Sequence, residues 1–263
     1  MQVWKLNDKK LQINSSKVSK IIKKIDFIFF REIYKKWQIT SLINKKNIKM
    51  FFQKFEALNK KLNIKKNDVV FFHINLSSFR VFYNEIKPNE IYYFAFFLLR
   101  SYFYGKGTFL IPSFSYSFCK TEKFDTNKTK SEVGMLANFL ISHYPQNRSS
   151  NPIFSVLSFG SKFKRFKNSS NLTCFGKNSC FERLIKNNGK ICFLGASFDR
   201  LTFIHYLEEK YQVNYRFNKI FNGIVDGEKV KIDYFVRDLD SKKKFNFNKL
   251  KSDLIKKKKN WKK

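Results

Sequence analysis

The sequence has few of the residues on which metal and redox sites are usually built. It contains three histidines and four cysteines, and no two cysteines form a C-x-x-C pair. We therefore expect no metal site and no disulfide framework, and we interpret the cysteines as small core residues. A dinucleotide-binding fingerprint is also missing, because Gly105 and Gly107 precede an expected strand instead of following one.

Long hydrophobic runs are absent as well. The longest wholly apolar run, residues 91–99, has nine residues, whereas a membrane-spanning helix needs roughly 20. The first ten residues lack the apolar stretch and cleavage site of a secretory signal. We expect no membrane span and a cytoplasmic location.

Negative charge is scarce. The chain has 53 Lys and Arg against 20 Asp and Glu, a formal net charge of +33. The excess is +14 in residues 1–67, +10 in residues 68–238 and +9 in residues 239–263. Lysine supplies 44 of the basic residues and arginine only 9, although nucleic-acid readers rely on arginine. We interpret the charge as compositional bias and do not expect a nucleic-acid function. A basic binding protein for RNA or an anionic membrane, inactive as an enzyme, stays open as a rival.

Apolar runs alternate with helical periods along the chain. Buried strands are expected at residues 69–74, 108–111, 154–159 and 190–194, and helices at 47–62, 90–104, 132–143, 181–186 and 202–211, with Ser131 and Ser179 as caps. This alternation predicts an α/β fold with a central, largely parallel sheet covered by helices. Asp226-Gly227 between two extended runs predicts a C-terminal β-hairpin.

No repeat or Gly/Pro-rich linker interrupts residues 47–238. We therefore divide the chain into a basic N-terminal extension of unknown role (1–46), one domain (47–240) and a Lys-rich C-terminal tail (241–263). The tail has the composition of a solvated end, and we expect its removal to leave catalysis intact.

His205 is the most informative histidine. Glu208 follows it three residues later in a predicted helix, so both side chains project from one face. A carboxylate can fix the imidazole tautomer and leave the other ring nitrogen free to accept a proton. An incidental surface pair is the alternative for an isolated His-x-x-Glu. His73 ends the first buried strand, where either a ligand-binding or a core role is open, and His143 is interpreted as structural.

Seven motifs accompany this pair in order along the chain. They are Asn67-Asp68-Val69-Val70-Phe71-Phe72-His73-x-x-Leu76-Ser77-Ser78, Ile111-Pro112-Ser113-Phe114-Ser115, Phe124-Asp125-x-x-x-Thr129-x-Ser131-x-Val133-Gly134, Arg148-Ser149-x-x-Pro152-x-x-Ser155-Val156-x-x-x-Gly160, Phe175-Gly176-x-x-Ser179, Gly189-Lys190-Ile191-Cys192-Phe193-Leu194-Gly195 and Thr202-x-x-His205-x-x-Glu208. The set resembles the aminoglycoside 3-N-acetyltransferase family, whose members use acetyl-CoA and lack the GNAT fold. The resemblance covers residues 67–210 and continues weakly to about 240.

The resemblance implies acetyl transfer from acetyl-CoA to an amine of an amino sugar. It makes His205 and Glu208 the catalytic pair. It assigns acetyl-CoA binding to His73, Asn75, Leu76, Ser77, Ser131, Val133, Gly134, Arg148 and Ser155, and acceptor binding to Asp125, Asn151 and Glu209. We favour direct attack over an acetyl-cysteine intermediate, because Cys192 lies in an apolar strand. The sequence leaves the oligomeric state open, a homodimer included.

Two departures from the family pattern concern the substrates. Ile74 and Asn75 stand where two serines are usual, and Asn151 stands where a histidine is common. Because residues 68–238 also carry +10, we expect a nucleotide-linked amino sugar of surface polysaccharide synthesis as acceptor. An aminoglycoside, acetylated in antibiotic resistance, is the alternative.

Overall fold

A central five-stranded sheet organises the chain. The computed structural model describes residues 2–5, 45–76, 91–170, 172–240 and 245–260. The strand order is β1-β6-β2-β3-β5, with β6, β2 and β3 parallel and an antiparallel strand at each edge. The strands are β1 (Gln2–Lys5), β2 (Val69–Ile74), β3 (Thr108–Pro112), β5 (Val156–Gly160) and β6 (Lys190–Leu194). The predicted α/β fold with its largely parallel centre is confirmed.

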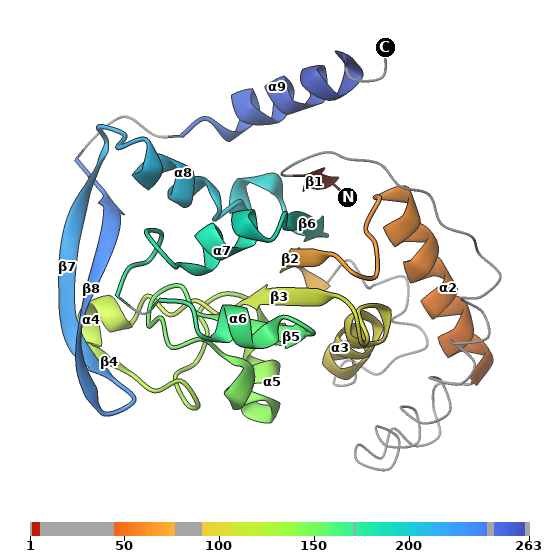
Figure 1. Cartoon of the computed structure of the whole chain (residues 1–263), viewed down its shortest axis with the longest axis horizontal. Helices are drawn as coiled ribbons and strands as arrows, with labels where there is room; N and C mark the ends of the chain where they lie inside the picture. Colours follow the sequence, from red (N-terminus) through yellow and green to blue (C-terminus); the bar gives the residue numbers. More distant parts are fainter. Residues whose placement is uncertain (1, 6–44, 77–90, 171, 241–244, 261–263) are drawn as a thin grey trace.

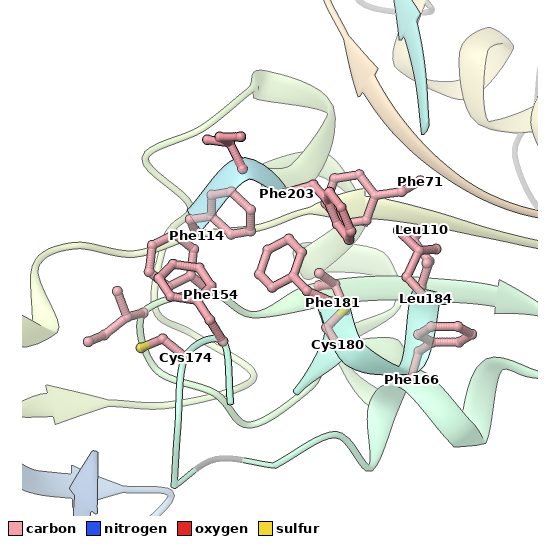
Figure 2. Packing of buried hydrophobic residues seen from close by; sticks show 14 of the residues in the cluster. Phe71, Leu110, Phe114, Phe154, Phe166, Cys174, Cys180, Phe181, Leu184 and Phe203 are labelled. Atoms are coloured by element: carbon pink, nitrogen blue, oxygen red, sulfur yellow. The ribbon is translucent and has the colours of Figure 1, made fainter. Parts of the chain in front are cut away.

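Alternate side chains of the strands point to opposite faces of the sheet and pack into two hydrophobic cores. Val70 and Phe72 of β2 face a cluster formed with α2 (Lys45–Lys61), α3 (Ile91–Tyr102) and α5 (Met135–His143). Phe71 faces the opposite cluster, which includes α6 (Phe163–Lys167), α7 (Cys180–Lys186) and α8 (Ile204–Lys210). Figure 2 shows part of this second cluster, in which the Phe71 ring lies 6.0 Å from that of Phe181 on α7. The sheet is therefore covered on both faces, as a parallel sheet requires.

A second, three-stranded sheet carries the predicted hairpin. Its order is β4-β7-β8, with β4 (Lys123–Phe124), β7 (Arg216–Val225) and β8 (Glu228–Arg237). Asp226 and Gly227 have φ angles of 50° and 91°, the left-handed pair that a tight hairpin turn needs. The hairpin runs along one side of the molecule, opposite α2 (Figure 1).

The predicted helices are confirmed with small shifts, except that α5 begins three residues later than expected. Gly134, with a φ of 77°, occupies its N-cap. Ser131 is therefore not the cap; its hydroxyl accepts a hydrogen bond from the Val133 N–H at 3.1 Å. Ser179 does cap α7, accepting from the Glu182 N–H. Short elements that were not predicted are β1, β4, α4 (Phe118–Thr121), α6 and the 3-10 turns η3 (Pro145–Asn147) and η4 (Phe198–Arg200).

The C-terminal segment differs from the solvated tail that we expected. Residues Phe247–Asn260 form a helix, α9, along the outside of the molecule (Figure 1). Phe245, Phe247 and Leu250 pack against the second core, where the Phe247 ring lies 6.5 Å from that of Phe198. Of the N-terminal extension, residues 6–44 lie outside the described part. No helix among the described residues is long and apolar enough to cross a membrane.

Candidate active site

His205 and Glu208 meet on α8 as their spacing predicts. His205 Nδ1 lies 2.6 Å from Glu208 Oε2, and the glutamate side chain is only 3% exposed while the histidine is 26% exposed. The described residues place no hydrogen-bond partner on His205 Nε2. With its proton on Nδ1 the imidazole would donate to the carboxylate and keep a lone pair on Nε2. The pair therefore has the geometry of an oriented base.

Tyr215, just before β7, and Arg216, its first residue, complete the surroundings of Glu208. Tyr215 donates its hydroxyl to Oε1 at 2.8 Å, and Arg216 Nε lies 2.7 Å from Oε2. The Nε contact is ionic, because its angle does not make a hydrogen bond. Burial raises the pKa of Glu208, but hydrogen bonds from His205 and Tyr215 and the charge of Arg216 outweigh it and leave the pKa below its ordinary value. Glu208 is therefore ionised at neutral pH.

The imidazole of His205 is held neutral. Burial lowers the pKa of His205, the hydrogen bond to Glu208 raises it, and the charge of Arg216 lowers it again. The resulting pKa is below the ordinary value of 6.5. In the tautomer with its proton on Nδ1, this nitrogen cannot also accept a hydrogen bond from Arg216, so the 2.9 Å contact with Arg216 Nη2 is electrostatic only. An unprotonated imidazole is the form that can take a proton from an incoming nucleophile.

A loop supported by Asn151 forms the wall beside this pair. The Phe175 ring lies 5.6 Å from the His205 ring. Asn151 donates to the carbonyl groups of Thr173 and Ser170 and accepts from two backbone N–H groups through Oδ1. The amide is buried and all of its donors and acceptors are used within the protein. The acceptor contact expected of Asn151 stays a prediction that this geometry does not favour. The position of Asn151 supports the loop that carries Phe175.

Two carboxylates lie next to the same loop. Glu209 Oε1 would be 3.0 Å from a Cβ at Gly176, so the glycine gives this side chain its room. Burial raises the pKa of Glu209 to about 7, with a further contribution from the negative charge of Asp233. Asp233 accepts two hydrogen bonds from Asn218 at 2.8 Å each. Glu209, predicted as an acceptor contact, is thus on the same helix as His205 and half-buried beside a second acid.

Arg148 has a different role from the predicted CoA contact. Its side chain is 0% exposed and stacks on Phe124 at 4.7 Å. All five N–H donors have acceptors, which are Ser155 Oγ, Ser115 Oγ and the carbonyl oxygens of Ser113, Thr126 and Thr129. All of these donors are used within the protein, and Ser155 is equally buried, which is typical of scaffold residues. The acetyl-CoA contacts expected of Arg148 and Ser155 stay predictions that this geometry does not favour.

His73 is a core residue at the end of β2. Its ring stacks on Phe193 at 5.0 Å and is 6% exposed. Burial lowers its pKa to about 3, and Nε2 has no hydrogen-bond partner in the described part of the chain. Asn75 is exposed just beyond the strand, and its backbone N–H donates to Leu194. Leu76 is half-buried, whereas Ser77 lies outside the described residues.

The remaining predicted residues fall into two groups. Ser131, Val133 and Gly134 form the turn before α5, and Asn138 bonds to both backbone groups of Ser131. Asp125 caps its own turn by accepting from the N–H groups of Asn127 and Lys128. No described contact joins Asp125 to His205.

The cysteines and the acidic residues give no support to other chemistries. Burial raises the pKa of all four thiols, which disfavours a thiolate nucleophile. No group of three or more potential metal ligands occurs among the described residues.

Sequence reasoning missed four residues of this site: Phe175, Tyr215, Arg216 and Asp233. Phe175 was noted only within its motif. Arg216 and Asp233 lie on the hairpin strands and Tyr215 directly before them, and no local spacing relates the three to His205.

Comparison with known proteins gives the family. Residues 96–263 match the aminoglycoside 3-N-acetyltransferase family. Similar solved structures include YokD from Bacillus subtilis, with a TM-score of 0.57, 23% identity, and coverage of 75% of this chain and 83% of that one. AAC-IIIb in a binary complex with CoASH has a TM-score of 0.64 at 19% identity, covering 78% and 84%. AAC-VIa bound to sisomicin has a TM-score of 0.56 at 17% identity, covering 74% and 77%. No curated protein sequence matches the chain.

The structure and these matches place the protein among N-acetyltransferases that use acetyl-CoA. The chain belongs to the aminoglycoside 3-N-acetyltransferase family, which its sequence resembles. The matched range starts after β2 and includes α9, so it extends further toward the C-terminus than the motifs do.

Proposed function

We propose that the protein transfers the acetyl group of acetyl-CoA to an amine of an aminoglycoside, with His205 as the general base and Glu208 as its orienting carboxylate. The observation that carries this proposal is the 2.6 Å contact between His205 Nδ1 and the buried, ionised Glu208. An incidental surface pair would not bury its carboxylate among three partners.

The reaction follows from this arrangement. The neutral amine of the acceptor attacks the thioester carbonyl carbon, and His205 Nε2 takes the proton that the amine loses as the C–N bond forms. The C–S bond then breaks, and the CoA thiolate leaves and takes up the proton to give CoASH. Glu208 stabilises the imidazolium that exists between these steps.

The donor side is proposed at the turn before α5 and beyond the end of β2. The first N–H groups of a helix have no intrahelical acceptor, and they favour phosphate or a thioester oxygen. Gly134, exposed at the α5 N-cap, lets a ligand approach this backbone closely. Val133, Ser131, Asn75 and Leu76 complete the proposed acetyl-CoA contacts.

The acceptor side is proposed at Glu209 and Asp233. Aminoglycosides are polycations, and two neighbouring carboxylates attract an ammonium group that the +10 of residues 68–238 would repel at long range. The family match and the sisomicin complex of AAC-VIa support an aminoglycoside over the nucleotide-linked sugar that we expected from net charge. Local carboxylates decide here because screening weakens the distant lysines.

Acetyl-transfer assays with matched variants test this proposal. His205→Ala should lose about 10²- to 10⁴-fold in kcat while its affinity for CoA is retained, and Glu208→Gln should lose less. His143→Ala is the control, because this histidine bonds to its own helix at the Phe139 carbonyl and should keep full activity. Full activity of the His205 variant would refute the assignment.

The acceptor is tested with a deoxystreptamine antibiotic and a nucleotide-linked amino sugar, each at low and moderate salt. We expect turnover of the antibiotic. Turnover of the nucleotide-linked sugar alone, weakened by salt, would instead favour an anionic acceptor. Salt-dependent RNA or vesicle binding with no CoA-induced thermal shift would favour the inactive binding protein.

A further inference from the structure

Arg216 is the one cation in direct contact with both members of the proposed catalytic pair among the described residues. Its side chain is 7% exposed, so its charge is almost removed from water. One end is fixed by Nη1, which donates to the Phe235 carbonyl on β8 at 3.0 Å. The other end reaches Glu208 at 2.7 Å and His205 Nδ1 at 2.9 Å. The hairpin thus delivers a fixed positive charge to the imidazole.

The charge balance of this cluster decides which form of His205 is stable. With Glu208 ionised, Arg216 charged and His205 neutral, the buried cluster has no net charge. Protonation of the imidazole would add an uncompensated positive charge next to a guanidinium, which is unfavourable in a poorly solvated site. Without Arg216, protonation of His205 would balance the negative charge of Glu208, and the two side chains would form a buried ion pair.

We propose that Arg216 is a positioning residue that keeps His205 unprotonated, so that the imidazole is ready to accept a proton from the acceptor amine. This inference rests on the proposed function of His205 as a base. It adds a specific consequence: the hairpin, through one arginine, sets the lower pH limit of the reaction. It also means that Arg216 offsets part of the stabilisation that Glu208 gives the imidazolium, so that the imidazolium returns its proton readily to the departing thiolate.

Other charged groups near His205 do not supply this effect. On its own helix Glu208 favours the imidazolium, and Glu209 is partly protonated at neutral pH with a pKa of about 7. Asp233 on β8 is negative, and the neighbouring loop presents the uncharged Phe175 ring. Tyr215, in the turn before β7, acts on Glu208 through its hydroxyl. All these groups are neutral or favour protonation, so Arg216 is the charged group that acts together with burial against it.

NMR titration of the histidine ring protons tests the inference without any substrate. The sequence contains three histidines, and the signal that disappears in His205→Gln identifies His205. In Arg216→Gln the His205 titration midpoint should rise by about one pH unit or more. Arg216→Lys, which keeps the charge, should rise less. The matched control is Arg237→Gln, because Arg237 is the cross-strand partner of Arg216 and is exposed; it should leave the midpoint unchanged.

Activity provides the second readout. Arg216→Gln should lose up to about fivefold in kcat/KM at pH 6.5, where more than half of wild-type His205 is unprotonated, and recover nearly all of it at pH 8.5. The full tenfold ratio of a one-unit shift is reached only at pH values below both midpoints. A merely structural role would lower the rate equally at both pH values, and that result, or coincident titrations of folded Arg216→Gln and wild type, would overturn the inference.

Two outcomes keep this test separate from the proposed function. If the variant titrates as expected but His205→Ala keeps full acetyl transfer, the charge effect stands and the base assignment fails. If Arg216→Gln does not fold, the wild-type titration decides: a His205 midpoint at or above 6.5 would overturn the inference, and one below it, with a smaller rise in Arg216→Lys, would support it.

Discussion

Acidification should destabilise this protein through His73. The imidazole is buried against Phe193 and has a pKa of about 3 in the folded state, against 6.5 when the chain is unfolded. Between these values the unfolded chain binds a proton that the folded protein excludes, so the free energy of unfolding falls as the pH falls below 6.5. At pH 5 the difference of 1.5 units corresponds to about 2 kcal/mol, and at pH 7.5 it is close to zero.

Replacing the imidazole by a ring that cannot be protonated isolates this effect. His73→Phe keeps an aromatic ring on Phe193 and removes the unpartnered Nε2. Urea unfolding of wild type and variant at pH 7.5 and pH 5 gives four free energies. We expect the advantage of the variant to be about 2 kcal/mol larger at pH 5. The double difference cancels His205, Glu209 and every other group that titrates in both proteins.

An equal pH dependence of the two proteins would refute the reasoning, since it would mean that the His73 ring already binds its proton when folded. A shift of the opposite sign would mean that protonated His73 has a buried anionic partner. Neither result depends on overpacking by phenylalanine, because that cost is present at both pH values.

Two further predictions concern stability. Arg148→Met should lower the free energy of unfolding by about 3–5 kcal/mol in chemical denaturation, because it leaves buried carbonyl and hydroxyl groups without donors; a loss below 1 kcal/mol would show that water replaces them. Deletion of residues 247–263 should cost about 2 kcal/mol or more, because Phe247 and Leu250 leave the second core; unchanged thermal unfolding would restore the solvated-tail interpretation.

The sequence predicted those parts of the fold in which local pattern and burial agree. Strands β2, β3 and β6 are continuous apolar runs and could be recognised as such, and Asp226-Gly227 fixed the hairpin. The direction of β5 was not predictable, because an apolar run looks the same in a parallel and an antiparallel pairing. Helix α5 begins three residues later than predicted, because the positive φ of Gly134 interrupts the helix despite the capping tendency of Ser131.

The same limit applies to the candidate site. His205 and Glu208 could be paired from sequence because helical spacing is local. Arg216 could not, since its distance to Glu208 depends on how the hairpin packs against α8. For Arg148 the sequence suggested a ligand contact where the structure shows internal hydrogen bonds. An arginine near serines can bind a phosphate or backbone carbonyl groups, and the sequence does not distinguish the two because burial is not visible in it.

The loop beside the catalytic pair also protects the outer edge of the hairpin. Strand β8 is the last strand of its sheet, and the loop bonds to it on both sides of one residue: the Asp233 N–H donates to Leu172, and the Cys174 N–H donates to the Asp233 carbonyl. An uncovered ten-residue edge would be a template for pairing with other chains. Substitutions that loosen this loop, those at Asn151 included, should therefore promote self-association as well as displace Phe175. The same two backbone hydrogen bonds thus cover part of the β8 edge and hold the loop that carries Phe175 beside the proposed acceptor site.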